Sequence, residues 1–323
     1  MGSGHWSTDV YDAARSYRAS TGASAFAHSD GGATTAHPDL DPMGVTVRES
    51  RDSDDHPESL AIAVLFDVTG SMRNVPRGLQ SKLPDLLGLL LRKGYVEHPH
   101  IMFGAVGDAT CDRAPLQIGQ FEADNRMDDD LGKILLEGGG GGQMTESYEL
   151  AMYFMSRHTA IDCFDRRGKR GYLFMIGDEL AYPAAKRREI AKVIGDEVPD
   201  DIPMRELMRE LRHRYDVYFI IPEGAYHAGS SRLRDFWQDL LGQNVLYLDD
   251  LNAVCETIAL TIGLAEDAID LDEGLDHLDE VGSDAGPSVS RALARLDAAR
   301  SAVAVSPGPP GLGGSAPATT TRL

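Results

Sequence analysis

Three aspartates stand directly after apolar segments that have the length of buried strands. Asp67 follows LAIAVLF, Asp108 follows IMFGAVG and Asp178 follows GYLFMIG. Continuous apolar runs of this length are typical of parallel strands covered on both faces. Because the carboxyl ends of parallel strands meet at one edge of a sheet, where ligands collect, we expect a shared polar site there.

The stretch LFDVTGSM adds two hydroxyl side chains to the first of these acids. Asp67, Thr69 and Ser71 alternate over five residues, and a sharp turn at Gly70 would bring one carboxylate and two hydroxyls together. Such hard oxygen ligands suit Mg²⁺, Mn²⁺ or Ca²⁺. The alternative is that Thr69 or Ser71 only caps the helix that follows. The second acid, Asp178, favours the metal site.

The same residues resemble a known family. FDVTGSM is similar to the D-x-[ST]-x-S motif of von Willebrand factor A (vWA) domains, which begins their metal-ion-dependent adhesion site (MIDAS). The preceding strand, the leucine-rich helix and the later IGDE follow that family's order over about residues 60 to 265. The resemblance implies that Asp67 holds the cation mainly through water, that Thr69 and Ser71 contribute hydroxyls, and that Asp178 is the second acid.

The family pattern also implies a threonine on the loop before the helix expected in ESYELAMYF. In EGGGGGQMTESYEL the nearest candidate is Thr145, while Glu146 or Ser147 could take its place. The five glycines at 138–142 allow unrestricted φ and close backbone approach. We favour a mobile loop over the metal or a plain connection; a phosphate-binding loop is disfavoured because no GK[ST] follows.

The resemblance further implies how the site would be used. A MIDAS leaves one coordination position open for a carboxylate from a partner protein, and intracellular bacterial members of the family often work beside AAA+ ATPases. The predicted function is therefore a non-enzymatic, divalent-cation-dependent protein-binding module in an assembly or remodelling system, with Mg²⁺, or Mn²⁺ or Ca²⁺, as its cofactor.

Two other interpretations remain open at this stage. DVTGS also resembles the element that carries the nucleophile of haloacid-dehalogenase-type phosphatases, in which Asp67 would accept phosphate and Asp178 would bind Mg²⁺. That family's second aspartate would be replaced by Thr69, and its lysine could only be Lys169. The third interpretation is a vWA-like scaffold that has lost the metal.

Composition excludes several classes of function. A formal net charge of −20 over 323 residues argues against nucleic acid as a partner, since a polyanion would be repelled. The three cysteines are sparse and odd in number, which predicts a reducing compartment without disulfides. We find no secretory signal, myristoylation site or apolar run that spans a bilayer, and therefore expect a cytoplasmic protein without membrane contact.

The pattern along the chain predicts one domain with two flanking segments. Residues 1–58 form an N-terminal extension that is partly ordered at best. Residues 59–266 alternate strands and helices, which predicts a doubly wound, mostly parallel α/β sheet with helices on both faces. The short connection before PLQIGQF predicts one antiparallel edge strand. Residues 267–323 are acidic and then Pro/Gly-rich, and are expected to be largely disordered.

Overall fold

The structure, a computed structural model, describes residues 4–70, 72, 74–138 and 144–305. Six strands form the central sheet: β2 (Leu60–Asp67), β3 (Pro99–Val106), β4 (Leu116–Ile118), β7 (Gly171–Ile176), β11 (Tyr215–Pro222) and β12 (Val245–Leu248). Their spatial order is β12-β11-β7-β2-β3-β4. All neighbours run parallel except β4, which pairs antiparallel with β3 at the edge. The predicted doubly wound α/β fold with one antiparallel edge strand is confirmed.

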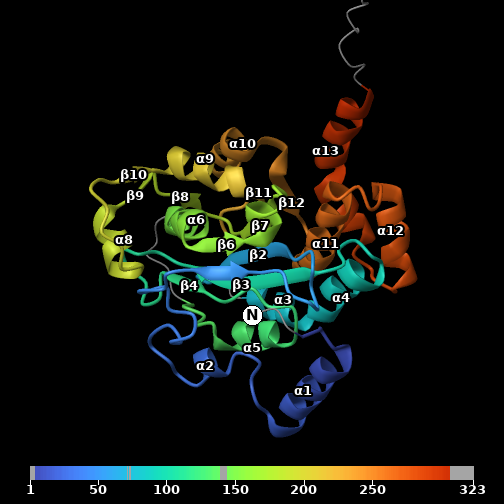
Figure 1. The fold of residues 1–323 in the computed structure, drawn as a ribbon, viewed down its shortest axis with the longest axis horizontal. Coiled ribbons are helices and arrows are strands. Elements are labelled where there is room, and N and C mark those ends of the chain that lie inside the picture. The colour runs from blue at the N-terminus through green and yellow to red at the C-terminus, as the bar shows by residue number, and fades with distance from the viewer. Residues whose placement is uncertain (1–3, 71, 73, 139–143, 306–323) are drawn as a thin grey trace, which may run out of the picture.

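Helices cover both faces of this sheet (Figure 1). One layer contains α6 (Tyr148–Arg157), α9 (Met204–Arg214) and α10 (Ser231–Leu241), and the opposite layer contains α3 (Asn74–Ser81), α4 (Leu83–Leu87) and α11 (Val254–Ala265). No helix in the described part of the chain combines the length and the apolar character that crossing a membrane requires.

Shorter elements complete the domain around these layers. The helical ones are α5 (Arg126–Lys133), α7 (Asp162–Asp165), α8 (Arg187–Val193), η1 (Gly88–Arg92), η2 (Gly242–Asn244) and η3 (Leu251–Ala253). Three two-stranded pairs lie outside the main sheet: β1 (Arg48–Ser50) with β6 (Thr159–Ile161), β9 (Ala184–Ala185) with β10 (Ile202–Pro203), and β5 (Thr145–Glu146) with β8 (Leu180–Ala181).

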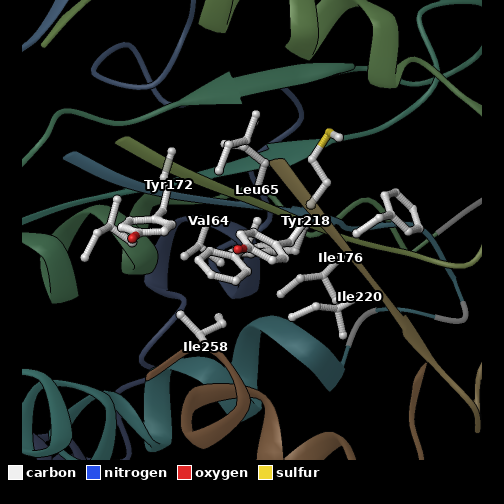
Figure 2. Packing of buried hydrophobic residues seen from close by; sticks show 14 of the residues in the cluster. Val64, Leu65, Tyr172, Ile176, Tyr218, Ile220 and Ile258 are labelled. Atoms are coloured by element: carbon white, nitrogen blue, oxygen red, sulfur yellow. The ribbon is translucent and has the colours of Figure 1, made fainter. Parts of the chain in front are cut away.

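Side chains from neighbouring strands form rows across the sheet. Val64 of β2 pairs in register with Phe174 of β7, which pairs with Tyr218 of β11, and the rings of Phe174 and Tyr218 stack. Figure 2 shows Val64 and Tyr218 on the side of Ile258, from α11, whereas Leu65 points to the other side. The alternation explains why the strands read as continuous apolar runs: both faces are buried.

The N-terminal extension is packed against the domain. Its helix α1 (Thr8–Thr21) buries Tyr11, whose phenol donates a hydrogen bond to the backbone oxygen of Gln80 at 2.7 Å. A second helix, α2 (Ala27–Asp30), and strand β1 follow. The sequence analysis expected partial order at best for residues 1–58, because it found little periodicity there. The contacts of this segment come from isolated buried residues, which produce no periodic pattern.

The segment after residue 266 also differs from the expectation of disorder. It forms α12 (Leu271–Glu280) and α13 (Gly286–Val305), which pack on α11 and β12. Leu278 and Leu293 are fully buried, and the phenol of Tyr95 hydrogen-bonds the imidazole of His277 at 2.8 Å. Leucines at helical spacing within the acidic stretch provide the buried face, and the acidic composition concealed that periodicity. Residues 306–323, the Pro/Gly-rich part of the predicted tail, lie outside the described residues.

Candidate metal centre

The candidate site lies at the point where the strand order of the sheet reverses. Numbered along the chain, the six strands follow the order 3-2-1-4-5-6, so β2 and β7 are the pair from which the connections diverge. Ligands of doubly wound folds bind in the crevice outside the carboxyl ends of such strands. Asp67 ends β2, and Asp178 lies two residues beyond the end of β7. The two predicted acids therefore meet at this crevice.

Asp67 is held in place by the residue two positions after it. Its Oδ1 accepts hydrogen bonds from the backbone N–H and the hydroxyl of Thr69, both at 2.7 Å. Its Oδ2 has no partner among the described residues, although the side chain is fully buried. Burial raises the pKa of Asp67, the Thr69 hydrogen bonds lower it, and the negative charge of Asp178 raises it further, with a net increase. Thr69 thus orients the carboxylate and leaves one oxygen for a ligand.

Asp178 and Glu179 bring two more carboxylates to the same place. One oxygen each from Asp67, Asp178 and Glu179 lie within 4.8 Å of one another, and all three residues are buried. The backbone N–H of His227 donates to Asp178 Oδ2 at 2.8 Å. Glu179 Oε2 has no partner in the described part of the chain. Burial and then the charges of Asp67 and Asp178 raise the pKa of Glu179 to about 8.

The segment after the glycine run contributes a fourth acid and a phenol. Glu146 is 2% exposed, and burial followed by the charges of Asp67 and Glu179 raises its pKa well above the usual range. Neither its Oε2 nor the fully buried phenol oxygen of Tyr148 has a hydrogen-bond partner among the described residues. Glu146 and Tyr148 therefore interact electrostatically with the three clustered carboxylates.

The three candidate loop ligands, Thr145, Glu146 and Ser147, have different surroundings in the structure. Thr145 is half-buried in β5, where it pairs with Leu180 of β8, and its backbone hydrogen-bonds Glu179. The Ser147 hydroxyl accepts the backbone N–H of Ala109 at 3.0 Å. Of these three neighbours, Glu146 is the one whose carboxylate is directed into the acidic cluster. Ser71 and the glycines at 139–142 lie outside the described residues, while Gly138 donates its N–H to Val68.

The third strand-end aspartate, Asp108, borders the cluster rather than joining it. It follows β3, and its carboxylate accepts hydrogen bonds from the Thr110 N–H at 2.8 Å and from the Tyr182 phenol at 3.1 Å. Its charge raises the pKa of both Glu146 and Glu179. Asp108 therefore adds negative potential to the site without contributing an oxygen to its centre.

This donor set fits a hard divalent cation. Mg²⁺, Mn²⁺ and Ca²⁺ prefer carboxylate and hydroxyl oxygens, which are the groups collected here. Two like charges 4.8 Å apart repel each other by about 3 kcal/mol at an effective dielectric constant of about 20. The cluster is therefore stable only if protons or a cation neutralise part of its charge, and one oxygen each of Asp67 and Glu179 has no hydrogen-bond partner among the described residues.

The lysine that a phosphatase would need lies elsewhere. Lys169 precedes β7 and forms an ion pair with Glu266, whereas Asp178 follows the same strand. A strand of 6 residues separates the two ends by roughly 20 Å. Lys169 therefore lies at the edge of the sheet opposite Asp67.

Sequence reasoning missed Glu179, Tyr148 and the contribution of His227. Glu179 directly follows the predicted ligand Asp178, and this position in the sequence could have marked it as a candidate. Tyr148 was assigned only to a helix, and nothing in the sequence connects it or the backbone of His227 with Asp67. Their proximity depends on how the loops after β7 and β11 fold back over the sheet.

Comparison with known proteins adds little beyond this geometry. No family model matches the sequence, and no curated protein matches it. Among solved structures, the pilus adhesin SpaC from Lactobacillus rhamnosus GG in its open conformation is 9% identical, with a TM-score of 0.44, covering 67% of this chain and 31% of that one. Proximal thread matrix protein 1 from the mussel byssus is 10% identical, with a TM-score of 0.40, covering 64% and 48%.

The chain thus spans about a third of the adhesin and about half of the mussel protein. These similarities are too weak to assign a family or an activity.

Proposed function

We propose that this protein is a divalent-cation-dependent protein-binding module of the vWA type. The observation that carries the proposal is the convergence of Asp67, Asp178 and Glu179, whose buried carboxylate oxygens lie within 4.8 Å of one another. They come from the ends of the two strands at which the sheet order reverses. The likeness of FDVTGSM to the MIDAS motif supports the same assignment from the sequence.

The residues of this chain have distinct tasks in the proposed site. Thr69 orients Asp67, and the loop that follows β11 fixes Asp178 through the N–H of His227. The indole N–H of Trp237 donates to the backbone oxygen of Glu179 at 2.9 Å and fixes that residue. A bound Mg²⁺, Mn²⁺ or Ca²⁺ would neutralise the clustered charge and fix the relative positions of these segments. The surface formed by the surrounding loops would then be ordered for a protein partner.

The proposal includes a cytoplasmic location. Cys111, Cys163 and Cys255 are free thiols, which suits a reducing compartment. The expectation that nucleic acid is not a partner rests on the net charge of −20.

A thermal-shift experiment tests the cation. We expect Mg²⁺ or Mn²⁺ to raise the unfolding midpoint of the wild-type protein, and Asp67→Ala to abolish that rise. Asp276→Ala, which removes an exposed acid of α12, is the matched control and should retain it. Equal midpoints in Mg²⁺ and in EDTA for the wild-type protein would disprove cation binding.

A pull-down in Mg²⁺ and in EDTA, with the same two variants, tests the partner. Capture that depends on Mg²⁺ and on Asp67 supports the binding module, whereas equal capture in both buffers favours a metal-free scaffold. The phosphatase interpretation predicts a beryllium fluoride adduct on Asp67 and turnover of an aryl phosphate. We expect neither, because Lys169 lies at the far edge of the sheet.

A further inference from the structure

We propose that Glu179 is an internal ligand of the cation and occupies the coordination position that a partner's carboxylate would otherwise take. This inference rests on the proposed function, because it assumes that a cation binds at Asp67 and Asp178. It changes what the partner must supply: the site is completed within the chain, and the partner contributes no acid to the metal.

The position of Glu179 supports a ligand role. Its carboxylate is within 4.8 Å of both Asp67 and Asp178, while Oε2 has no partner among the described residues. Its nearest basic group is the imidazole of His227, at 4.0 Å from Oε1, which is beyond hydrogen-bond distance. A buried carboxylate oxygen without a partner is costly unless an ion or a proton satisfies it.

Contacts around Glu179 also restrict its movement away from the acidic cluster. The indole N–H of Trp237 fixes its backbone oxygen, and Trp237 is fully buried in contact with the rings of Tyr148 and Phe219. The next residue, Leu180, pairs with Thr145 in the β5–β8 ladder. The backbone that follows Glu179 is therefore fixed, and the Thr145 backbone N–H donates a hydrogen bond to the Glu179 carboxylate and helps to position it.

The total charge argues against an additional acid. Asp67, Asp178 and Glu179 are each less than 9% exposed and together carry three negative charges when ionised. A divalent cation neutralises two of them. A further carboxylate from a partner would then approach a buried site of the same sign, where like charges repel strongly because the dielectric constant is low.

The burial of the three carboxylates also argues against an acid supplied by a partner. Asp67 and Asp178 are fully buried and Glu179 is 7% exposed, so Glu179 is the member of the three that reaches the surface. An acidic side chain from outside would have to displace it. The loop after β11, whose His227 N–H holds Asp178, also carries Tyr226. Tyr226 is 84% exposed, and its ring lies edge-on to that of His227. An exposed aromatic side chain, rather than the metal, is the feature that this face offers to a partner.

The number of water molecules on the bound ion tests the inference directly. Europium(III) is a hard cation whose luminescence lifetimes in H₂O and D₂O report its bound water. We expect Glu179→Gln to add bound water and to weaken Mn²⁺ binding by about tenfold or more, as expected for loss of a charged ligand. Glu223→Gln, an exposed acid at the start of the loop after β11, is the matched control and should change neither quantity.

Acetate serves as a probe for an open position. In the wild-type protein we expect acetate to leave the bound water of europium(III) unchanged, and in Glu179→Gln to displace the added water. If acetate displaces water from the wild-type site, or if Glu179→Gln binds Mn²⁺ as tightly as wild type, the inference is wrong although the cation site stands. If the wild-type protein binds neither ion, the proposed function itself fails.

A folding control accompanies the variant. Unfolding of metal-free Glu179→Gln by denaturant should show a midpoint at least equal to that of wild type, because the change removes one charge from the cluster. A cooperative transition at that midpoint ensures that weakened Mn²⁺ binding reflects a lost ligand rather than a lost fold.

Discussion

The phenol oxygen of Tyr148 occupies the space beside Gly177 into which a side chain would project. A β-carbon placed on Gly177 would overlap with this oxygen and would lie 3.4 Å from the β-carbon of Asp67. Gly177 connects β7 to Asp178, so the absence of a side chain lets Tyr148 reach the acidic cluster from α6. This pair of residues fixes how closely the helix approaches the sheet edge.

Gly177→Ala should destabilise the protein. The added methyl group overlaps with a fully buried phenol, and overpacking of this kind costs about 1–3 kcal/mol in the free energy of unfolding. Urea unfolding measures the change. Gly224→Ala, in the loop after β11 with no atom near the added β-carbon, is the control and should have little effect. The double variant Gly177→Ala/Tyr148→Phe should recover part of the loss; no recovery would mean that the overlap with the phenol is not the cause.

Tyr148→Phe on its own should not destabilise the metal-free protein. Its hydroxyl is buried without a partner among the described residues, and an unsatisfied buried polar group costs about 1–3 kcal/mol. We therefore expect an equal or higher free energy of unfolding in EDTA. Tyr153→Phe, on the same helix, removes a phenol that donates to Asp196 at 2.6 Å, and should lower stability by about 1 kcal/mol. A loss for Tyr148→Phe as large as that of the control would contradict the prediction.

The sheet and the first two acids of the cluster could be predicted from sequence because their signals are local. An apolar run that ends in Asp67 or Asp178 marks both a buried strand and the polar residue at its carboxyl end. The alternation of strands and helices predicts a parallel sheet, whereas the order that places β2 beside β7 is seen only in the structure. Each inference needs only neighbouring residues and general rules for parallel sheets.

Glu179 and Tyr148 were beyond such reasoning, and Glu146 could not be singled out, because their positions depend on tertiary structure. Glu146 was one of three candidates, and only the β5–β8 pairing shows which side chain enters the cluster. The N-terminal extension was underestimated for a similar reason: Tyr11 is a single buried anchor on an otherwise polar helix. Isolated anchors leave no periodicity to read.

Tyr11→Ala should show that the N-terminal extension is part of the folded domain. Tyr11 is 1% exposed and hydrogen-bonds Gln80, so truncation leaves a cavity and removes a buried hydrogen bond. Losses of about 3–5 kcal/mol are typical for large aromatic residues replaced by alanine. Tyr17→Ala, on the same helix but 67% exposed, should change the free energy of unfolding by less than about 0.5 kcal/mol. Equal effects of the two changes would indicate an extension that does not stabilise the fold.

Asp67→Asn should separate the structural and the metal-binding roles of this residue. The amide oxygen still accepts the two hydrogen bonds from Thr69, while one negative charge leaves the cluster. We expect the unfolding midpoint in EDTA to be unchanged or higher than that of wild type, and the Mg²⁺-induced rise to disappear. Calorimetric scans with and without Mg²⁺ measure both. A lower midpoint in EDTA combined with an intact Mg²⁺ effect would show that Asp67 is a structural acceptor only.

The stability of the metal-free protein should fall as the pH rises from about 4.5 to 8. Burial and the neighbouring acids raise the pKa of Glu179 from 4.5 to about 8, and that of Asp67 is raised as well. Between the unfolded and the folded pKa the native state keeps a proton that the unfolded state has lost. The free energy of unfolding therefore decreases with pH across this range.

A cation reverses this dependence, because it binds the deprotonated carboxylates and competes with the protons. The Mg²⁺-induced rise in the unfolding midpoint should consequently be small near pH 5 and increase toward pH 8. Scans at a series of pH values, in EDTA and in Mg²⁺, measure both trends. Glu179→Gln removes one of the titrating groups, so its metal-free stability should depend less steeply on pH than that of wild type. An equally steep profile in the variant would mean that Glu179 does not exchange its proton over this range.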